Sequence, residues 1–295
     1  MLRIKPHIWF AQDKAKEAAE FYSTVMPDST VDYAGHFPTG DGECETVEFT
    51  VAGQPFLGIS AGHHMEINPS ISFMVHFDAA ERIDEAWGKL IENGKVMMPL
   101  DRYPFSERYG WVADKYGVSW QLMLANPDNG ERPVIMPSML FTPPMAGKAN
   151  EAVDFYTSVF KDGKRGTTAT RQEDMGPDKT GTLLYGDFYI DQTWLAAMDS
   201  AHQHGFNFND AISLLVPCET QEEIDYYWSA LSADGKPGQC GWLKDKFGVS
   251  WQVTSTIVPE TLKSGSPEQI SRVTQAFFQM QKVDVAALQQ AYDGQ

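Results

Sequence analysis

The feature that most constrains this chain is an internal repeat. The stretch "DKYGVSWQ", which begins at Asp114, returns as "DKFGVSWQ" at Asp245. Likewise "EAAEFYSTVM", which begins at Glu17, returns as "EAVDFYTSVF" at Glu151. The matching segments keep the same order along the chain, while the spacing between them drifts. We interpret this pattern as a tandem duplication whose insertions lie in loops, where extra length costs little free energy.

The length of the chain agrees with a duplication. A chain of 295 residues is large for one hydrophobic core and sufficient for two. Between the copies lies "NPDNGERP" at 126–133, and its proline, glycine and asparagine are typical of a boundary. We therefore predict a first domain at residues 1–127 and a second at residues 134–258.

The end of the sequence has helical signals of its own. Ser266 suits an N-cap, Pro267 suits the first helical position, and Gln269 completes a capping box. We predict a C-terminal helical tail over residues 266–293. It either packs on the domains or serves as a dimerisation arm, so we expect a monomer or a homodimer.

Within each copy a smaller unit recurs. A short strand leads into a helix that has an apolar face, and three strand-like runs follow. The apolar face of the first such helix consists of Ala18, Phe21, Tyr22 and Val25. The unit of strand, helix and three strands occurs twice per copy. Four units predict an α+β fold in which helices cover one face of curved mixed sheets.

Charge and cysteine content exclude several function classes. A formal net charge of −17 argues against a nucleic-acid partner and against docking on an anionic membrane. The sequence has no apolar run of about 18 residues that could span a bilayer. Its three cysteines, Cys44, Cys218 and Cys240, are widely spaced, which favours a reducing compartment. We expect a cytoplasmic protein.

Several motifs resemble those of a known superfamily. They are "EAVDFYTSVF" at 151–160, "CGWLKDKFGVSWQV" at 240–253 and the tail "QMQKVDVAALQQAYDG" at 279–294. They are similar to the vicinal-oxygen-chelate superfamily of glyoxalase, bleomycin-resistance and dioxygenase proteins. Within it they resemble the PhnB-like group, often labelled 3-demethylubiquinone-9 3-methyltransferase. The resemblance implies tandem glyoxalase-like domains that form two cup-shaped mixed sheets around small-molecule sites.

The resemblance also implies positions for a divalent metal. Relatives place ligands on the first strand, at the start of the second module and, as a glutamate, on the last strand. In the first copy these positions fall on His7, Ser70 and Gln121, and in the second on Ser138, Ala211 and Gln252. An amide oxygen binds a divalent cation more weakly than a carboxylate does. We therefore expect weakened or absent metal sites, above all in the second copy.

Strand alternation indicates which side chains face a cup. His7 and Trp9 share one face of their strand, opposite Ile8 and Phe10, and Gln121 lies opposite Trp120. His7 and Gln121 are thus the candidate metal ligands of the first domain, and His7 is the candidate catalytic residue. The third ligand of such a site could be an acid, for which the candidates are Glu43, Glu45, Glu48, Asp101 and Glu107. The predicted ligand-binding residues are Trp9, Ser70, Gln121, Ser138 and Gln252.

Four functions remain open at this stage. The first is a small-molecule binder that needs no cofactor, and the aromatic residues favour a flat or apolar ligand. The second is a metal-dependent isomerase, lyase or dioxygenase that uses one divalent ion in the first domain. The third is a largely structural protein with decayed sites. The fourth is the methyltransferase of the family label, which lacks support from any Gly-x-Gly-x-x-Gly turn.

Overall fold

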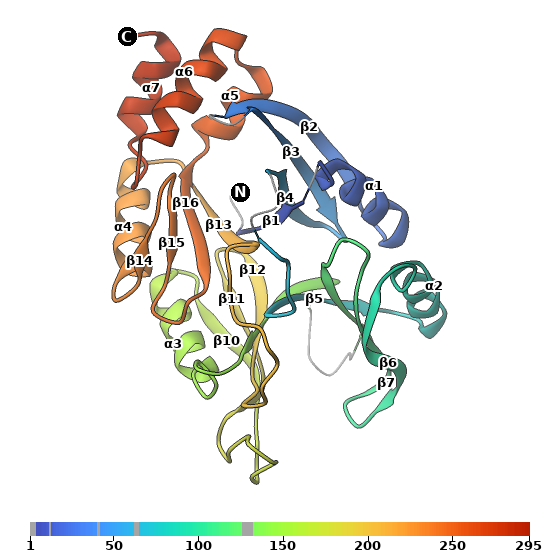
Figure 1. Cartoon of the computed structure of the whole chain (residues 1–295). Helices are drawn as coiled ribbons and strands as arrows, with labels where there is room; N and C mark the ends of the chain where they lie inside the picture. Colours follow the sequence, from blue (N-terminus) through green and yellow to red (C-terminus); the bar gives the residue numbers. More distant parts are fainter. Residues whose placement is uncertain (1–3, 12, 40–41, 62–64, 126–131) are drawn as a thin grey trace.

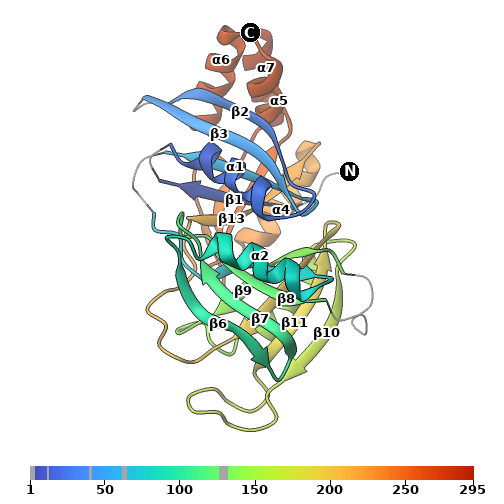
Figure 2. The same ribbon diagram turned by 90° about the vertical axis from the view of Figure 1, so that its right-hand side faces the viewer.

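The computed structural model describes residues 4–11, 13–39, 42–61, 65–125 and 132–295. Its strands form two mixed sheets of eight strands each. Figures 1 and 2 show how the strands and helices are arranged. Each of the four predicted units is present as a strand, a helix and three further strands. The predicted α+β fold with two curved sheets is therefore confirmed. Within the described residues no helix has the length and apolar character needed to cross a membrane.

Sheet A combines the first and the last unit of the chain. Its strand order is β14–β15–β16–β13–β1–β4–β3–β2. The bounds of its strands are β1 (Lys5–Phe10), β2 (Thr30–Thr39), β3 (Gly42–Val51), β4 (Gln54–Ser60), β13 (Ile212–Cys218), β14 (Lys236–Pro237), β15 (Trp242–Lys244) and β16 (Ser250–Ser255).

Sheet B combines the second and the third unit. Its strand order is β10–β11–β12–β9–β5–β8–β7–β6. The bounds of its strands are β5 (Ile71–Phe77), β6 (Lys95–Tyr103), β7 (Ser106–Ala113), β8 (Ser119–Leu124), β9 (Ile135–Phe141), β10 (Lys164–Thr170), β11 (Leu183–Ile190) and β12 (Thr193–Asp199).

This pairing corrects one expectation from the sequence. A cup was expected within each repeat, but β1 pairs antiparallel with β13, and β5 pairs antiparallel with β9. Each sheet thus takes one unit from each repeat. The physical reason is that hydrophobic periodicity specifies the unit and its buried face, whereas it leaves open which distant unit completes the sheet. The linker predicted at 126–133 falls mostly at residues 126–131, outside the described residues.

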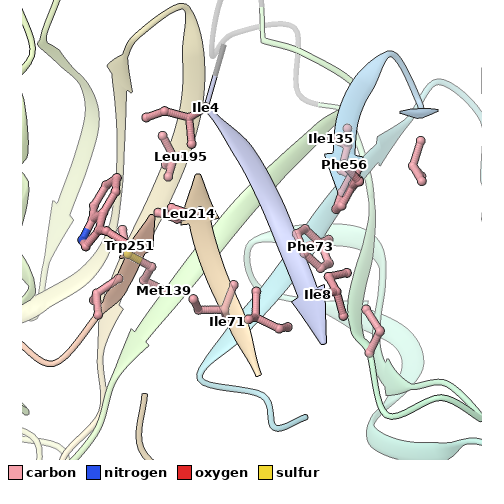
Figure 3. Packing of buried hydrophobic residues seen from close by; sticks show 14 of the residues in the cluster. Ile4, Ile8, Phe56, Ile71, Phe73, Ile135, Met139, Leu195, Leu214 and Trp251 are labelled. Atoms are coloured by element: carbon pink, nitrogen blue, oxygen red, sulfur yellow. The ribbon is translucent and has the colours of Figure 1, made fainter. Parts of the chain in front are cut away.

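The helices and the apolar faces of the sheets form the core. Phe56 of β4 contacts Phe73 of β5 across the two sheets, with ring centroids 4.9 Å apart, and Figure 3 shows how side chains from both sheets gather there. Trp120 and Trp251 are fully buried in this core. The helices that cover the sheets are α1 (Ala15–Val25), α2 (Ala80–Leu90), α3 (Ala149–Val159) and α4 (Gln221–Ser232).

The repeated phrase has a structural role in both sheets. Asp114 Oδ1 accepts hydrogen bonds from the backbone N–H groups of Tyr116 and Val118, and its Oδ2 accepts one from Trp120 Nε1 at 2.8 Å. Asp245 repeats this pattern with Trp251 Nε1 at 2.9 Å. Burial raises the pKa of Asp114 to about 6. The buried carboxylate therefore shapes the turn and anchors the tryptophan at the second position of the following strand, β8 or β16.

The C-terminal tail packs on sheet A as three helices, α5 (Ile257–Ser264), α6 (Pro267–Phe278) and α7 (Val285–Asp293) (Figure 1). The predicted capping box at Ser266 and Gln269 is present. Tyr33 of β2 donates a hydrogen bond to the carbonyl of Leu262 at 2.9 Å. The amide of Cys240 donates to the carbonyl of Met280 at 2.7 Å. The tail thus contacts both ends of sheet A.

Candidate functional site

A cavity of about 980 Å³ lies between the curved face of sheet A and the tail helices α5 and α6. It is lined by strands of the first and the last unit, and mostly by apolar and aromatic side chains. We call the face of sheet A that lines this cavity cup A. Cup B is the corresponding face of sheet B, which carries Ser72, Gln121 and Ser138. A volume of this size suits a small organic molecule.

His7 lies on the central strand of cup A. Its side chain is 3% exposed, and burial lowers its pKa to about 3, so the imidazole is neutral at physiological pH. Its Nδ1 atom is buried and has no hydrogen-bond partner in the described structure. The ring packs edge-on against Trp242, with centroids 5.6 Å apart. A buried ring nitrogen without a partner is uncommon in proteins and marks this position as unusual.

Gln252 is linked to His7 by one residue, Ser213, which lies between them. Ser213 of β13 is the register partner of His7, and the Gln252 side-chain amide donates to Ser213 Oγ at 2.9 Å. The other end of the same amide, Oε1, has no hydrogen-bond partner among the described residues. Because Gln252 lines the cavity, this carbonyl oxygen is an acceptor available to a ligand.

Two tryptophans form an aromatic wall in cup A. The ring centroids of Trp9 and Trp242 are 6.2 Å apart, with planes inclined by 52°. Trp9 Nε1 donates to the carbonyl of Ala61 at 2.9 Å, which fixes the orientation of its ring. Both residues line the cavity. Fixed aromatic surfaces of this kind favour flat or apolar ligands.

The structure separates the site residues predicted from the sequence. His7, Trp9 and Gln252 line the cavity of cup A together. Gln121 and Ser138 belong to sheet B, because β8 pairs with β5, and β5 pairs with β9. The expectation that His7 and Gln121 face the same cup is therefore wrong.

In cup B both ends of the glutamine amide have partners within the protein. Gln121 donates to Ser72 Oγ at 2.7 Å, as Gln252 does to Ser213 in cup A. Its Oε1, however, accepts a hydrogen bond from the hydroxyl of Tyr109 at 2.7 Å. The residue beside Gln121 is thus Ser72, and not the predicted Ser70, which lies just before strand β5.

A buried ion pair occupies another part of cup B. The strand register places Asp187 on the same face as Ser138, through Ala196. Asp187 pairs with Arg132, whose guanidinium nitrogen lies 3.1 Å from the carboxylate and whose planar group stacks on Trp194 at 3.8 Å. The side chain of Asp187 is 1% exposed. Asp187 is therefore partnered within the protein, whereas the Oγ atom of Ser138 is buried without a hydrogen-bond partner among the described residues.

The donor set of cup A does not fit a tightly held divalent metal. His7 offers one imidazole, while Ser213 and Gln252 offer neutral oxygen atoms. Of the acids considered, Glu45 accepts from the N-terminal amides of α1 and from Ser60 Oγ. Glu48 lines the cavity but is paired with Lys263 at 2.7 Å. No group of three or more histidine, cysteine, aspartate or glutamate side chains suited to a metal occurs within the described ranges.

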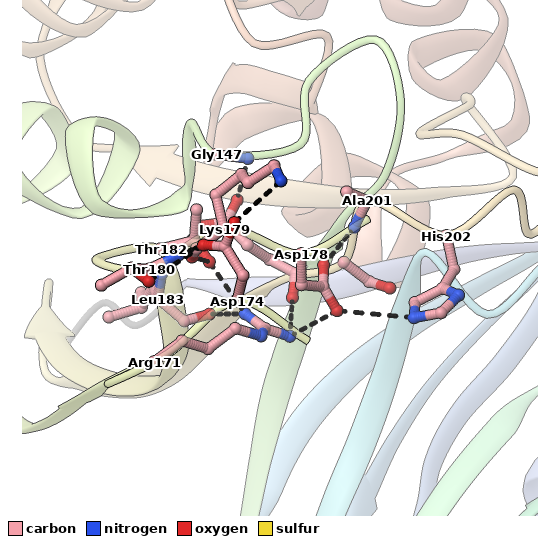
Figure 4. A network of polar contacts seen from close by, with 12 residues as sticks. Gly147, Arg171, Asp174, Asp178, Lys179, Thr180, Thr182, Leu183, Ala201 and His202 are labelled. Carbon is pink, nitrogen blue, oxygen red and sulfur yellow. Dashed lines mark hydrogen bonds and ion pairs between the residues drawn. The ribbon is translucent and has the colours of Figure 1, made fainter. Parts of the chain in front are cut away.

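The remaining acid candidates and histidines lie elsewhere. Asp101 and Glu107 belong to β6 and β7 of sheet B, and Glu43 is exposed near the start of β3. His202 faces Asp178 at 3.6 Å in a network that also contains Arg171, 3.2 Å from the same carboxylate (Figure 4). These ion pairs hold the loop between β10 and β11 in place. His63 and His64 lie outside the described residues.

The cysteines of the cavity are poor nucleophiles. Cys44 and Cys240 both line cup A. Burial raises the pKa of each thiol to about 11, so both remain protonated at neutral pH. The described wall of cup A therefore has no activated thiolate. It can bind a ligand by apolar contact and hydrogen bonding.

Sequence reasoning missed two residues that complete cup A. Ser213 bridges His7 and Gln252, and Trp242 packs on the His7 ring. Strand alternation could have placed Ser213 on the cup face, because it shares the parity of Leu215 in "ISLLV". Only the pairing of the first and last units, however, brings these residues next to His7.

Comparison with known proteins agrees with this fold. No curated protein matches the sequence significantly. The PhnB protein from Bacillus cereus is 35% identical over 41% of this chain and 98% of its own, with a TM-score of 0.38. Glyoxalase I from Zea mays has a TM-score of 0.54 and 11% identity, over 85% of this chain and 93% of its own. A Bacillus subtilis protein whose name proposes a dioxygenase has a TM-score of 0.50 and 10% identity, over 86% of this chain and 85% of its own.

The glyoxalase I likeness supports the vicinal-oxygen-chelate fold alone, because the identity is low. A family model matches the chain twice, at residues 2–123 and 133–254, once in each repeat. Together the two matches cover well over half of the sequence. The chain therefore belongs to the family described as 3-demethylubiquinone-9 3-methyltransferase.

Proposed function

We propose that this protein binds a small, flat or apolar molecule in cup A and needs no resident divalent metal to do so. The observation that carries the proposal is the combination of a ligand-sized cavity, an aromatic wall and a carbonyl oxygen without a partner. That oxygen is Oε1 of Gln252, and the wall consists of Trp9 and Trp242. Cavities that bind small molecules are commonly apolar with a few placed polar groups.

The chemistry of cup A suits recognition by stacking and by one hydrogen bond. The aromatic wall removes apolar ligand surface from water, which contributes about 25 cal/mol for each Å² buried. A ligand N–H or O–H that donates to Gln252 Oε1 adds about 1 kcal/mol. Neutral His7 presents an uncharged ring to the ligand. Together these groups favour a flat molecule, whose affinity rises when it also carries a hydrogen-bond donor.

A direct test measures the binding of 2-naphthylacetamide, which is flat and carries an amide donor, by isothermal titration calorimetry. We expect saturable binding of one equivalent to the full chain, with matching quenching of tryptophan fluorescence. The Leu57→Phe variant narrows the cavity, because Leu57 lines it beside His7, and should weaken binding at least tenfold. Equal affinity in this variant, or no binding to the parent protein, would overturn the proposal.

The family description favours a second candidate, methyl transfer to a demethylated quinone precursor. Such a reaction would need a methyl donor held against the acceptor oxygen and a base beside it. The described wall of cup A offers neutral His7 as its one imidazole. Titration with S-adenosylmethionine tests this candidate: saturable binding that the Leu57→Phe variant abolishes would support it.

A further inference from the structure

Cup A carries a pair of lysines at one end. Lys236 of β14 is the register partner of Lys244 of β15, and both line the cavity. Directly opposed residues of paired strands point to the same face, with Cβ atoms about 5 Å apart. Two like charges placed this way are unfavourable unless an anion compensates them.

Only one of the two lysines is compensated by the protein. Lys244 Nζ lies 3.0 Å from Asp210 Oδ2. Lys236 has no carboxylate within ion-pair distance in the described part of the chain. At the other end of the cavity, Glu48 is shared by Lys263 at 2.7 Å and by Lys5 at 3.9 Å. The wall of the cavity therefore carries excess positive charge, although the chain has a formal net charge of −17.

The lysine pair is a property of cup A alone. In sheet B the residue that corresponds to Lys236 in the repeat is Lys95, and its register partner is Ala113. The residue that corresponds to Lys244 is thus an alanine in sheet B. Cup A, whose face lines the cavity, therefore has two opposed lysines at this edge, where cup B has one.

The position of the pair relates it to the aromatic wall. Trp242 and Lys244 are two residues apart on β15 and so share a face. At a strand rise of about 3.4 Å per residue, the lysine end lies about 7 Å along the strand from the Trp242 backbone. A small aromatic acid is long enough to span this distance.

We propose that the ligand of cup A is an organic carboxylate with a flat aromatic body. The body lies against Trp9 and Trp242, and the carboxylate lies between Lys236 and Lys244. This inference rests on the proposed function, since it names the chemical class that the same cavity selects. An aromatic cation of the same shape is disfavoured, because the unpaired Lys236 repels it.

Three probes of one shape test the inference by calorimetry on the full chain: 2-naphthylacetate, 2-naphthylacetamide and 2-(2-naphthyl)ethylammonium. We expect the acetate to bind about fivefold more tightly than the amide, as the attraction of a half-exposed lysine pair predicts, and the ammonium to bind most weakly. The preference should shrink as salt is raised from 10 mM to 500 mM. Lys236→Met should reduce it to within twofold, while the matched variant Lys95→Met should leave it unchanged.

The possible failures can be told apart. If none of the three probes binds, or if Leu57→Phe does not weaken them, the proposed function itself is wrong. If all three bind in the cavity but the acetate has no advantage over the amide, the inference of a carboxylate is overturned and the binding function stands. An acetate preference that persists unchanged in Lys236→Met also overturns it, because the charge would then be recognised elsewhere.

Discussion

Cup A and cup B are built from the same unit, yet they differ in what their central glutamine can do. Both glutamines donate to a serine on the neighbouring strand, Gln252 to Ser213 and Gln121 to Ser72. In cup B the hydroxyl of Tyr109 occupies the amide oxygen. The presence or absence of one hydroxyl donor therefore decides whether the amide oxygen of this repeated glutamine is bonded within the protein or is open to a ligand.

Cup A lacks that donor because a cysteine stands at the equivalent position. The repeat aligns Tyr109 with Cys240. The amides of Cys240 and Gly241 donate to the carbonyls of Met280 and Gln281, so the tail holds this segment and β15 begins only at Trp242. Cup A therefore has no counterpart of Tyr109, and the tail forms one wall of its cavity instead.

The largest effect should appear where the two cups are alike. Asp114→Ala and Asp245→Ala each remove a buried carboxylate that accepts from two backbone amides and one indole. Asp245 also accepts a hydrogen bond from the Tyr156 hydroxyl at 2.7 Å, so its variant should show the larger loss. Leaving these donors unpaired should lower the free energy of unfolding by about 4 kcal/mol in each variant. Urea denaturation measures the loss. A loss in one variant that is less than half of that in the other would show that the two turns are not equivalent.

The next effect concerns acid stability and is specific to cup A. Burial lowers the pKa of His7 in the folded state to about 3, from an ordinary value of 6.5. Below pH 6.5 the unfolded chain binds a proton at His7 that the folded chain does not, so stability is lost as the pH falls. The slope is at most about 1.4 kcal/mol per pH unit.

The His7→Gln variant should remove this contribution between pH 6.5 and pH 4. Ser138→Ala, at the matching position of cup B, should keep the wild-type slope. Thermal or urea unfolding at several pH values measures both variants against the parent protein. Parallel pH profiles for His7→Gln and the wild type would contradict the assignment of a neutral, buried imidazole.

A smaller effect should follow when the glutamine of cup B is freed. Tyr109→Phe removes the hydroxyl that donates to Gln121 Oε1. The unpaired buried oxygen should cost about 1–2 kcal/mol of the free energy of unfolding. Affinity for 2-naphthylacetamide in cup A should not change. Weakened binding in this variant would mean that the probe occupies cup B.

The smallest effect distinguishes the two glutamines in binding. Gln252→Leu removes the acceptor proposed for the ligand, and we expect affinity for 2-naphthylacetamide to fall about fivefold, as the loss of one neutral hydrogen bond predicts. The matched variant Gln121→Leu should leave affinity unaltered. The same calorimetric titration measures both. Equal losses in the two variants would argue for a general change of the fold.

Sequence reasoning reached the units and the faces of the strands, because both follow from local periodicity. It placed His7, Trp9 and Gln252 on cup faces, and all three line the cavity. It joined His7 to Gln121, because nothing local specifies which distant unit completes a sheet. Sequence patterns therefore could not predict the side-chain contacts that depend on this pairing, such as those of Ser213 and Trp242 with His7 and its neighbours.

The pairing of the first unit with the last also has a consequence for how the protein is made. The strands of sheet B are contiguous in the chain, from β5 to β12, and are complete once the third unit has left the ribosome. The strands β1 to β4 must wait for β13 to β16, and the cavity needs α5 and α6 as well. A chain that stops after β12 has every strand of sheet B but no cup A, so the cavity exists only in a molecule synthesised nearly to its end.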